Sequence, residues 1–161
     1  MKTRLILMLT LLVPFLLKAQ ENNFTISAKI GALNAPAKAY LDYMDNGIGK
    51  EDSCVLVNGE FRFSGKISNI ANARMALDHT GEGKGKAVYT GDVIYIYFGK
   101  EQVKISSKDS LQNAVFSGSK VYTAFQEYNK KIGGTIMALT KAVNQEFRSA
   151  TPEQQKDSLF F

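Results

Sequence analysis

The stretch SCVLVNGEFRFS, residues 53–64, decides the fold class. Asn58-Gly59 separates two runs rich in apolar and aromatic residues, and Asn-Gly favours a two-residue type I′ turn because both turn positions need a positive φ. Such a turn fixes the register, which pairs Val57 with Glu60, Leu56 with Phe61, Val55 with Arg62 and Cys54 with Phe63. We therefore expect a β-hairpin, with Cys54 on the same buried face as Leu56, Phe61 and Phe63.

Short stretches of β pattern continue on both sides of this turn. Apolar and polar residues alternate over 24–30, 37–43 and 74–79, and β pattern returns at 103–105 and 114–116. Residues 93–98 are apolar on both faces, which is typical of a central strand. The spacing of about 8 to 12 residues predicts an antiparallel β-sandwich of about 7–9 strands over residues 20–118.

The apolar period changes after Ser119. Apolar residues three or four apart, from Val121 to Phe147, predict an amphipathic helix. An unbroken helix over 120–149 would be about 45 Å long, so either Gly133-Gly134 bends it or part of its stripe packs on something else. Thr151-Pro152-Glu153-Gln154 carries the N-cap, first-turn proline and capping box of another helix. Because the chain ends soon afterwards at Leu159-Phe160-Phe161, we expect residues 119–161 to be a truncated helical linker.

The first 19 residues have the pattern of a secretory signal peptide: Lys2 and Arg4, an apolar run of about 13 residues, then Ala19. That run is too short for a transmembrane helix, and no cysteine follows it to carry a lipid. We expect cleavage after Ala19 and no membrane anchor afterwards. Losing Lys2, Arg4 and Lys18 lowers Lys+Arg from 20 to 17 against 15 acidic residues, a net charge of +2. This charge gives no support to a nucleic-acid partner.

Three features suggest chemistry and have simpler interpretations. Cys54 is the single cysteine, so the chain forms no internal disulfide, and its expected position beside Phe63 favours an unreactive buried thiol. His79 is the single histidine and lies beside Asp78, but a metal needs three or four converging ligands. The glycine-rich residues 81–86 lack the Walker pattern and are interpreted as a mobile hairpin loop. We expect no catalytic, cofactor-binding or metal-binding residue.

Tyrosines provide the one candidate ligand-binding surface. Tyr89, Tyr95 and Tyr97 could form an aromatic face with Phe98, as in sandwiches that bind sugars or peptides. Tyrosines on strands also serve as half-buried packing residues. Exposure of Tyr95 and Tyr97 would favour a binding face, and full burial would exclude it.

Residues 24 to about 119 resemble the N-terminal all-β domain of unknown function that precedes the thioredoxin-like domain in exported bacterial thiol-disulfide oxidoreductases, which are thioredoxin/AhpC-TSA-like family proteins. The resemblance rests on the order of short segments: residues 24–30, 39–41, 52–53, 57–67, 103–105 and 116–119. It implies a β-sandwich followed by linker helices, in the periplasm or cell envelope of a Gram-negative bacterium. In that family a Cys-X-X-Cys pair in the following domain carries the redox chemistry, and this chain has only Cys54.

The resemblance therefore implies a noncatalytic accessory module that positions or recognises a protein partner or a missing C-terminal thioredoxin-like domain. A truncated gene product, a fragment and a stand-alone module all fit, and the apparent truncation favours the first two. The alternative is an extracellular module that binds a glycan or peptide through the tyrosines. A third class, an enzyme that uses Cys54, would require a reactive thiol.

Overall fold

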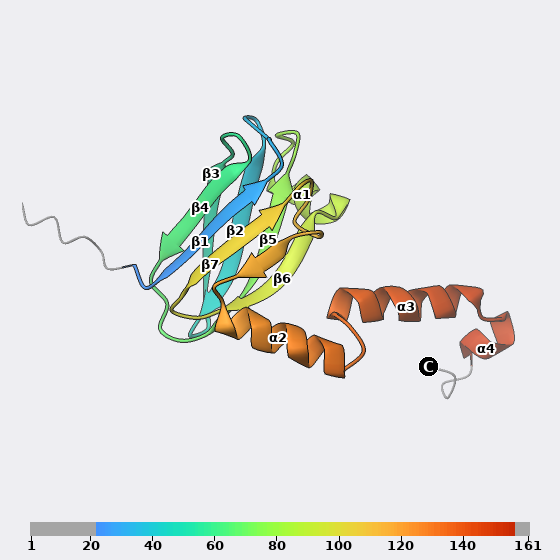
Figure 1. The fold of residues 1–161 in the computed structure, drawn as a ribbon. Helices are drawn as coiled ribbons and strands as arrows, with labels where there is room; N and C mark the ends of the chain where they lie inside the picture. The colour runs from blue at the N-terminus through green and yellow to red at the C-terminus, as the bar shows by residue number, and fades with distance from the viewer. Residues whose placement is uncertain (1–21, 157–161) are drawn as a thin grey trace, which may run out of the picture.

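A computed structural model describes residues 22–156 and shows two four-stranded sheets packed face to face, followed by helices (Figure 1). The strands are β1 (Phe24–Ile30), β2 (Lys38–Asp45), β3 (Ile48–Val55), β4 (Glu60–Gly65), β5 (Ala71–Asp78), β6 (Val93–Phe98), β7 (Gln102–Ser107) and β8 (Val115–Ser117). The helices are α1 (Lys84–Thr90), α2 (Lys120–Lys131), α3 (Ile136–Ser149) and α4 (Pro152–Lys156). The expected signal peptide and the apolar residues 159–161 lie outside the described residues.

The eight strands form sheets with the orders β4-β1-β7-β8 and β3-β2-β5-β6. The expected mainly β, sandwich-like fold is confirmed. One neighbouring pair differs from the expected antiparallel arrangement, because β1 and β7 run parallel. Alternation within a strand reports only which face is buried, so it carries no information on the direction of a neighbouring strand.

Alternate residues of both sheets face a common core. Ile26, Leu41 and Met75 are completely buried there. Phe24 packs against Tyr43 and Phe98, with ring centroids 5.7 Å and 4.8 Å away. Each large side chain buried in this way contributes about 1.5–3 kcal/mol to stability, so the core holds the two sheets together.

Asn58-Gly59 forms the expected turn but not the expected hairpin. Its φ angles are 50° and 74°, as a type I′ turn requires, and Val57 pairs with Glu60. Beyond that pair the predicted register is wrong, because β3 pairs with β2 in one sheet and β4 pairs with β1 in the other. The turn is a corner between the sheets, which lets Leu56 and Phe61 enter the same core from opposite sides.

A second Asn-Gly pair closes the true hairpin. Asn46 and Gly47 have φ angles of 50° and 78° and connect β2 to β3, with Asp45 opposite Ile48. The sequence contains the same turn signal at both places. The two turns differ in the strands that their flanking segments pair with, and this pairing is decided by the whole fold.

Two further expectations need correction. Residues 81–86 lie, as expected, in the connection between the paired antiparallel strands β5 and β6, but residues 84–86 already belong to α1. The loop before α1 is held by the buried Asp78 carboxylate, which accepts hydrogen bonds from the backbone N–H groups of residues 80–83. Strand β6 lies at a sheet edge and not in the centre. Its outward side is apolar because Tyr97 packs against Phe125 of α2, with ring centroids 4.9 Å apart.

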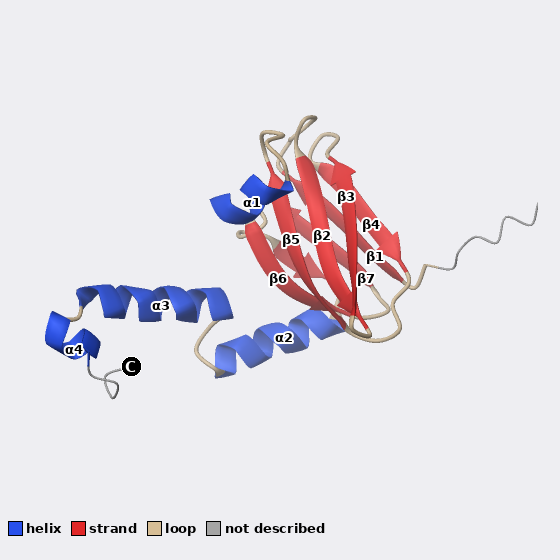
Figure 2. Ribbon diagram, turned by 180° about the vertical axis from the view of Figure 1, so that it is seen from behind, coloured by secondary structure: helices blue, strands red, loops and turns tan. Residues whose placement is uncertain are grey.

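The helical segment is broken where the sequence predicts it. Gly133 and Gly134 have φ angles of 91° and 142°, and they separate α2 from α3. The capping box of α4 is also confirmed, since Gln154 N–H donates to Thr151 Oγ1 and Thr151 N–H donates to Gln154 Oε1. Helix α2 starts against the sandwich, whereas both views place α3 away from the two sheets (Figures 1 and 2).

Candidate functional site

The β3-β2-β5-β6 sheet lies in front in Figure 2, and its outward side carries a row of polar residues. The register sets Glu51 beside Asp42, Asp42 beside Arg74, and Arg74 beside Tyr95. Four strands thus contribute one residue each to a continuous row. We call this surface the outer face, and it also contains Tyr40 and Tyr97 at other outward positions of β2 and β6.

Ion pairs hold the middle of the outer face. Arg74 Nη2 lies 2.6 Å from Asp42 Oδ2, and Lys84 Nζ of α1 lies 2.6 Å from Asp42 Oδ1 and 3.0 Å from Glu51 Oε1. Burial on its own raises the pKa of Asp42, but the hydrogen bonds and charges of Lys84 and Arg74 outweigh it and lower that pKa. Asp42 in turn raises the pKa values of Arg74 and Lys84. The network therefore stays charged and ties α1 to the sheet.

The three tyrosines predicted to form a ligand face do not lie on one strand. Tyr95 and Tyr97 occupy alternate outward positions of β6 and are 49% and 39% exposed. Tyr89 belongs to α1 instead and is 90% exposed. Tyr40 lies on the same outer face as Tyr95, and its place between buried Ala39 and Leu41 is the alternation signal that would have identified it.

A shallow hollow of about 280 Å³ opens beside this network. It is lined by Tyr40, Glu51, Asp52, Ser53 and Lys84. Carboxylate, hydroxyl and ammonium groups offer both hydrogen-bond donors and acceptors, next to one aromatic ring. Such a set suits a polar ligand with hydroxyl or amide groups.

Asp78 fixes the position of α1 over one end of the outer face. Its carboxylate accepts from Gly81 N–H at 2.8 Å and from Gly83 N–H at 2.7 Å, besides the neighbouring N–H groups of residues 80 and 82. Burial alone raises the pKa of Asp78, and the four backbone donors outweigh it and lower that pKa. Asp78 is 4% exposed and therefore has a structural role.

His79 does not join Asp78. Its Nε2 lies 2.5 Å from Asp92 Oδ2, and Asp92 Oδ1 accepts a hydrogen bond from Leu111 N–H at 2.8 Å. This contact links the end of β5 to the start of β6 and to the loop before β8. No group of three or more histidine, cysteine, aspartate or glutamate side chains within the described residues is placed to hold a metal ion.

Cys54 is half-buried on β3, and its side chain packs partly against the core. Its backbone pairs with Ala39 and not with Phe63, so the predicted neighbour is wrong. The thiol lies 3.5 Å from the carbonyl oxygen of Val55. The partly inward position agrees with the expected side of the strand.

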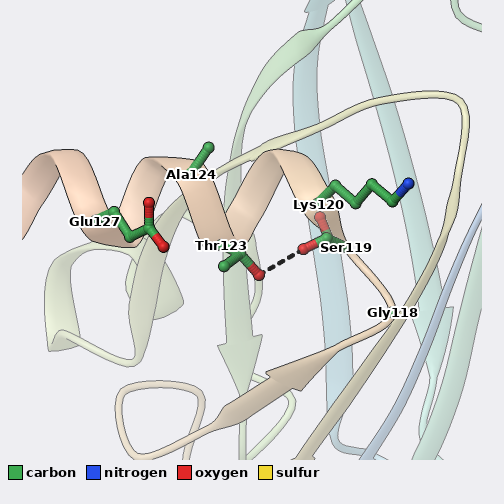
Figure 3. Close-up of a pocket in the computed structure, with 6 residues that line it drawn as sticks. All are labelled: Gly118, Ser119, Lys120, Thr123, Ala124 and Glu127. Atoms are coloured by element: carbon green, nitrogen blue, oxygen red, sulfur yellow. Dashed lines mark hydrogen bonds between the residues drawn. The ribbon is translucent and has the colours of Figure 1, made fainter.

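A larger hollow of about 480 Å³ lies at the start of α2 (Figure 3). It is lined by Gly118, Ser119, Lys120, Thr123, Ala124 and Glu127. The groups around it already bind one another, since Thr123 Oγ1 donates to Ser119 O, as the dashed line in Figure 3 marks. The Glu101 carboxylate also accepts hydrogen bonds from Ser119 Oγ and Lys120 N–H. This region is the cap that anchors α2 to the sandwich.

Helices α2 and α3 form an arm, defined as residues 120–149, that carries apolar side chains into solvent. The first turns of α2 pack on the sandwich, where Tyr122 stacks on Phe116 with ring centroids 3.9 Å apart. Further along, Tyr128 is 59%, Ile132 41% and Val143 53% exposed. The expected apolar stripe is therefore only partly covered by this chain's own sheets.

No helix among residues 22–156 has both the length and the apolar character that crossing a bilayer requires. Comparison with curated proteins found no match, and neither did comparison with solved structures. A family model matches residues 24–125, which covers more than half of the chain and includes all eight strands and the start of α2. The chain therefore belongs to the family described as Domain of unknown function (DUF4369).

Proposed function

We propose that this chain is a noncatalytic module that positions or recognises a protein partner in an exported bacterial thiol-disulfide oxidoreductase system. Two points support the proposal. Residues 24 to about 119 resemble the β domain that precedes a thioredoxin-like domain in such proteins, and the DUF4369 match covers nearly the same segment. The partner is a thioredoxin-like domain that carries the Cys-X-X-Cys pair.

The observation that carries the proposal is the exposed stripe of the arm. Residues at the start of α2 pack against the sandwich, and Phe125 contacts Tyr97 of β6. Beyond this anchor, Tyr128, Ile132 and Val143 leave apolar surface in water, at a cost of about 25 cal/mol for each Å² that a partner could cover. An anchored helix with an uncovered apolar stripe suits a docking element between two domains.

The first 19 residues support an exported location, in the periplasm or cell envelope of a Gram-negative bacterium. Cleavage after Ala19 would leave Gln20 as the new N-terminus. N-terminal sequencing of the protein recovered from the periplasm tests this part of the proposal. A chain that still begins with Met1 would contradict it.

The functional test is insulin reduction in the presence of dithiothreitol. A thioredoxin-like protein that carries a Cys-X-X-Cys pair would be assayed alone, with this chain, and with a Tyr128→Ser/Val143→Ser variant of this chain. We expect this chain alone to be inactive, the native chain to alter the partner's rate, and the double variant to lose that effect. A Tyr89→Ser variant is the matched control, because Tyr89 is exposed on α1, outside the arm. An unchanged rate with the native chain would contradict the proposal.

A second candidate function is the binding of a glycan or peptide on the outer face. The observation that favours it is the exposure of Tyr95 and Tyr97 on the sheet that also carries the hollow beside Tyr40. Sites that bind small polar ligands commonly combine aromatic rings with hydrogen-bond donors and acceptors. Screening against glycan and peptide arrays, with Tyr95→Ser as the comparison, tests this function. Equal signals from both proteins would count against it.

A further inference from the structure

The free edge of β6 has its backbone groups in position to accept another strand. Leu77 N–H donates to Asp92 O at 3.0 Å, which makes residues 77 and 92 a hydrogen-bonded pair at the start of the β5–β6 ladder. Hydrogen-bonded and non-hydrogen-bonded pairs alternate in an antiparallel ladder. Val93, Tyr95 and Tyr97 therefore direct their N–H and C=O groups away from β5, toward the open side of the sheet.

The other described edges carry features that discourage pairing. Edge strand β3 has charged Glu51 and Asp52, and the Asp52 carboxylate already accepts the Ser53 N–H at 2.7 Å. Edge strand β4 has Glu60 and Arg62 at the positions that face outward. Strand β8 has only three residues. Strand β6 differs, because residues 93–98 contain no charged side chain, and charged residues are the common protection of an edge.

The borders of this edge define its centre. At one end, the loop before β8 is held to Asp92 by the Leu111 N–H, 2.8 Å from Asp92 Oδ1. At the other end, Phe125 of α2 packs on the Tyr97 ring on the outward face of the sheet and leaves the backbone edge of the strand open. The open stretch between these borders is centred on Tyr95.

We propose that β6 pairs antiparallel with β6 of a second copy of this chain, with Tyr95 opposite its own counterpart and Val93 opposite Tyr97. This register is two-fold symmetric, and it lets the three outward-facing residues of each copy exchange about six hydrogen bonds. It also brings tyrosine and β-branched side chains together on the outer face, pairs that stabilise sheets. Arg74, the cross-strand neighbour of Tyr95, is paired with Asp42, so its charge adds little repulsion between the two copies.

A second copy fits this edge better than an unrelated strand, because the edge is complementary to itself. It carries no charge that would select an oppositely charged partner, and the symmetric register leaves none of its three outward-facing residues unpaired. The result is a continuous eight-stranded sheet formed by two sandwiches. This inference goes beyond the proposed function and does not depend on it.

Disulfide trapping tests the register. In the full chain with Cys54→Ser, Tyr95→Cys places two thiols on directly opposed residues, whose Cα atoms lie about 5.5 Å apart in such a pair. That separation is within the range for a disulfide. Tyr97→Cys is the matched control, because Tyr97 faces Val93 and lies about 13 Å from its own counterpart, four residues along the strand. We expect a covalent dimer with Tyr95→Cys and at least tenfold less with Tyr97→Cys. Equal cross-linking of both variants, or none, would overturn the proposal.

Sedimentation over a range of concentrations tests the dimer without cysteine chemistry. Tyr95→Pro removes the outward N–H from both copies, and edge strands tolerate proline where the N–H faces outward. We expect this variant to weaken dimerisation by roughly tenfold to a hundredfold. Val55→Pro, at an outward-facing position of the β3 edge, should leave dimerisation unchanged. A native chain that stays monomeric at all concentrations, as it would if the edge awaits a different protein, would overturn the proposal.

Discussion

Two glycines with the same local conformation should respond very differently to alanine. Gly47 and Gly59 each follow an asparagine, and their φ angles are 78° and 74°. Alanine at either position has a left-handed backbone, which costs about 1–2 kcal/mol. Local strain alone therefore predicts equal destabilisation of the two variants.

The atoms around the two glycines predict different costs for the two alanine variants. A Cβ atom at Gly47 meets nothing within 4 Å, whereas at Gly59 it would lie 2.4 Å from both the Ile30 and the Gly31 carbonyl oxygens. Gly59 also donates its N–H to Leu33 O and accepts from Ile30 N–H, bonds of 2.5 Å and 2.8 Å that a shift of the corner would weaken. Each such bond contributes about 1 kcal/mol, and a steric overlap in a packed region costs about 1–3 kcal/mol. We therefore expect Gly59→Ala to lower the free energy of unfolding by about 4–7 kcal/mol, and Gly47→Ala by about 1–2 kcal/mol.

Urea unfolding followed by circular dichroism measures both losses of free energy, and thermal unfolding measures the corresponding shifts in Tm. For a domain of this size, the loss at Gly59 should lower Tm by more than about 10 °C, or leave the chain largely unfolded if its stability is near the low end of about 5–15 kcal/mol. The change at Gly47 should lower Tm by about 3–8 °C. Equal effects at the two positions would refute the assignment of Asn58-Gly59 to a packed corner between the sheets.

Three further changes test the contacts around the outer face and the arm. Asp78→Asn should lower the free energy of unfolding by about 2–4 kcal/mol at pH 7. Folding lowers the Asp78 pKa, so the Asp78 carboxylate stabilises the folded state fully above its unfolded pKa of about 4. This stabilisation is lost as the pH falls through the lower pKa of the folded state. The unfolding curves of the native chain and the variant should therefore converge in acid. Asp42→Asn should cost about 1–2 kcal/mol and speed amide hydrogen exchange in α1, because Lys84 loses one of its two charged partners and keeps only the exposed Glu51; unchanged exchange would contradict the tie between α1 and the sheet. Ser119→Ala should cost about 1 kcal/mol in urea unfolding by removing the cap that accepts Tyr122 N–H, whereas Thr135→Ala at the α3 cap should reduce helicity without moving the main transition.

The sequence predicts this fold well where the signal is local. Alternation in residues 24–30 and 103–105 identified two strands, and Gly133-Gly134 located the break between α2 and α3. Thr151 and Gln154 form the expected capping box. In each case a few neighbouring residues determine the conformation.

Prediction failed where a distant strand decides. Asn58-Gly59 and Asn46-Gly47 have the same turn chemistry. Asn46-Gly47 closes a hairpin because β2 and β3 pair with each other, whereas Asn58-Gly59 forms a corner because β4 pairs with β1 of the other sheet. Residues 93–98 look like a central strand, but their outward side is apolar because Tyr97 meets Phe125, which is 28 residues away. Sequence patterns report burial, and they do not identify what covers the residue.

The outer face was found only in part for the same reason. Tyr95 and Tyr97 could be selected as aromatic residues on one strand. Asp42, Arg74 and Lys84 come from three separate elements, and the β2–β5 register together with the position of α1 brings their charges together. Tyr89 was grouped with the other tyrosines because a strand pattern does not reveal α1, or the four backbone hydrogen bonds by which Asp78 holds the loop before it.

The most direct test of the central claim is a hydrogen-exchange footprint of this chain with and without a thioredoxin-like protein that carries a Cys-X-X-Cys pair. If the arm is the docking element, binding should slow amide exchange around Tyr128, Ile132 and Val143 and leave β6 unchanged. The Tyr128→Ser/Val143→Ser variant should show no protection at the same concentrations. Protection centred on Tyr95 and Tyr97 with an unaffected arm, or no protection anywhere, would contradict the account.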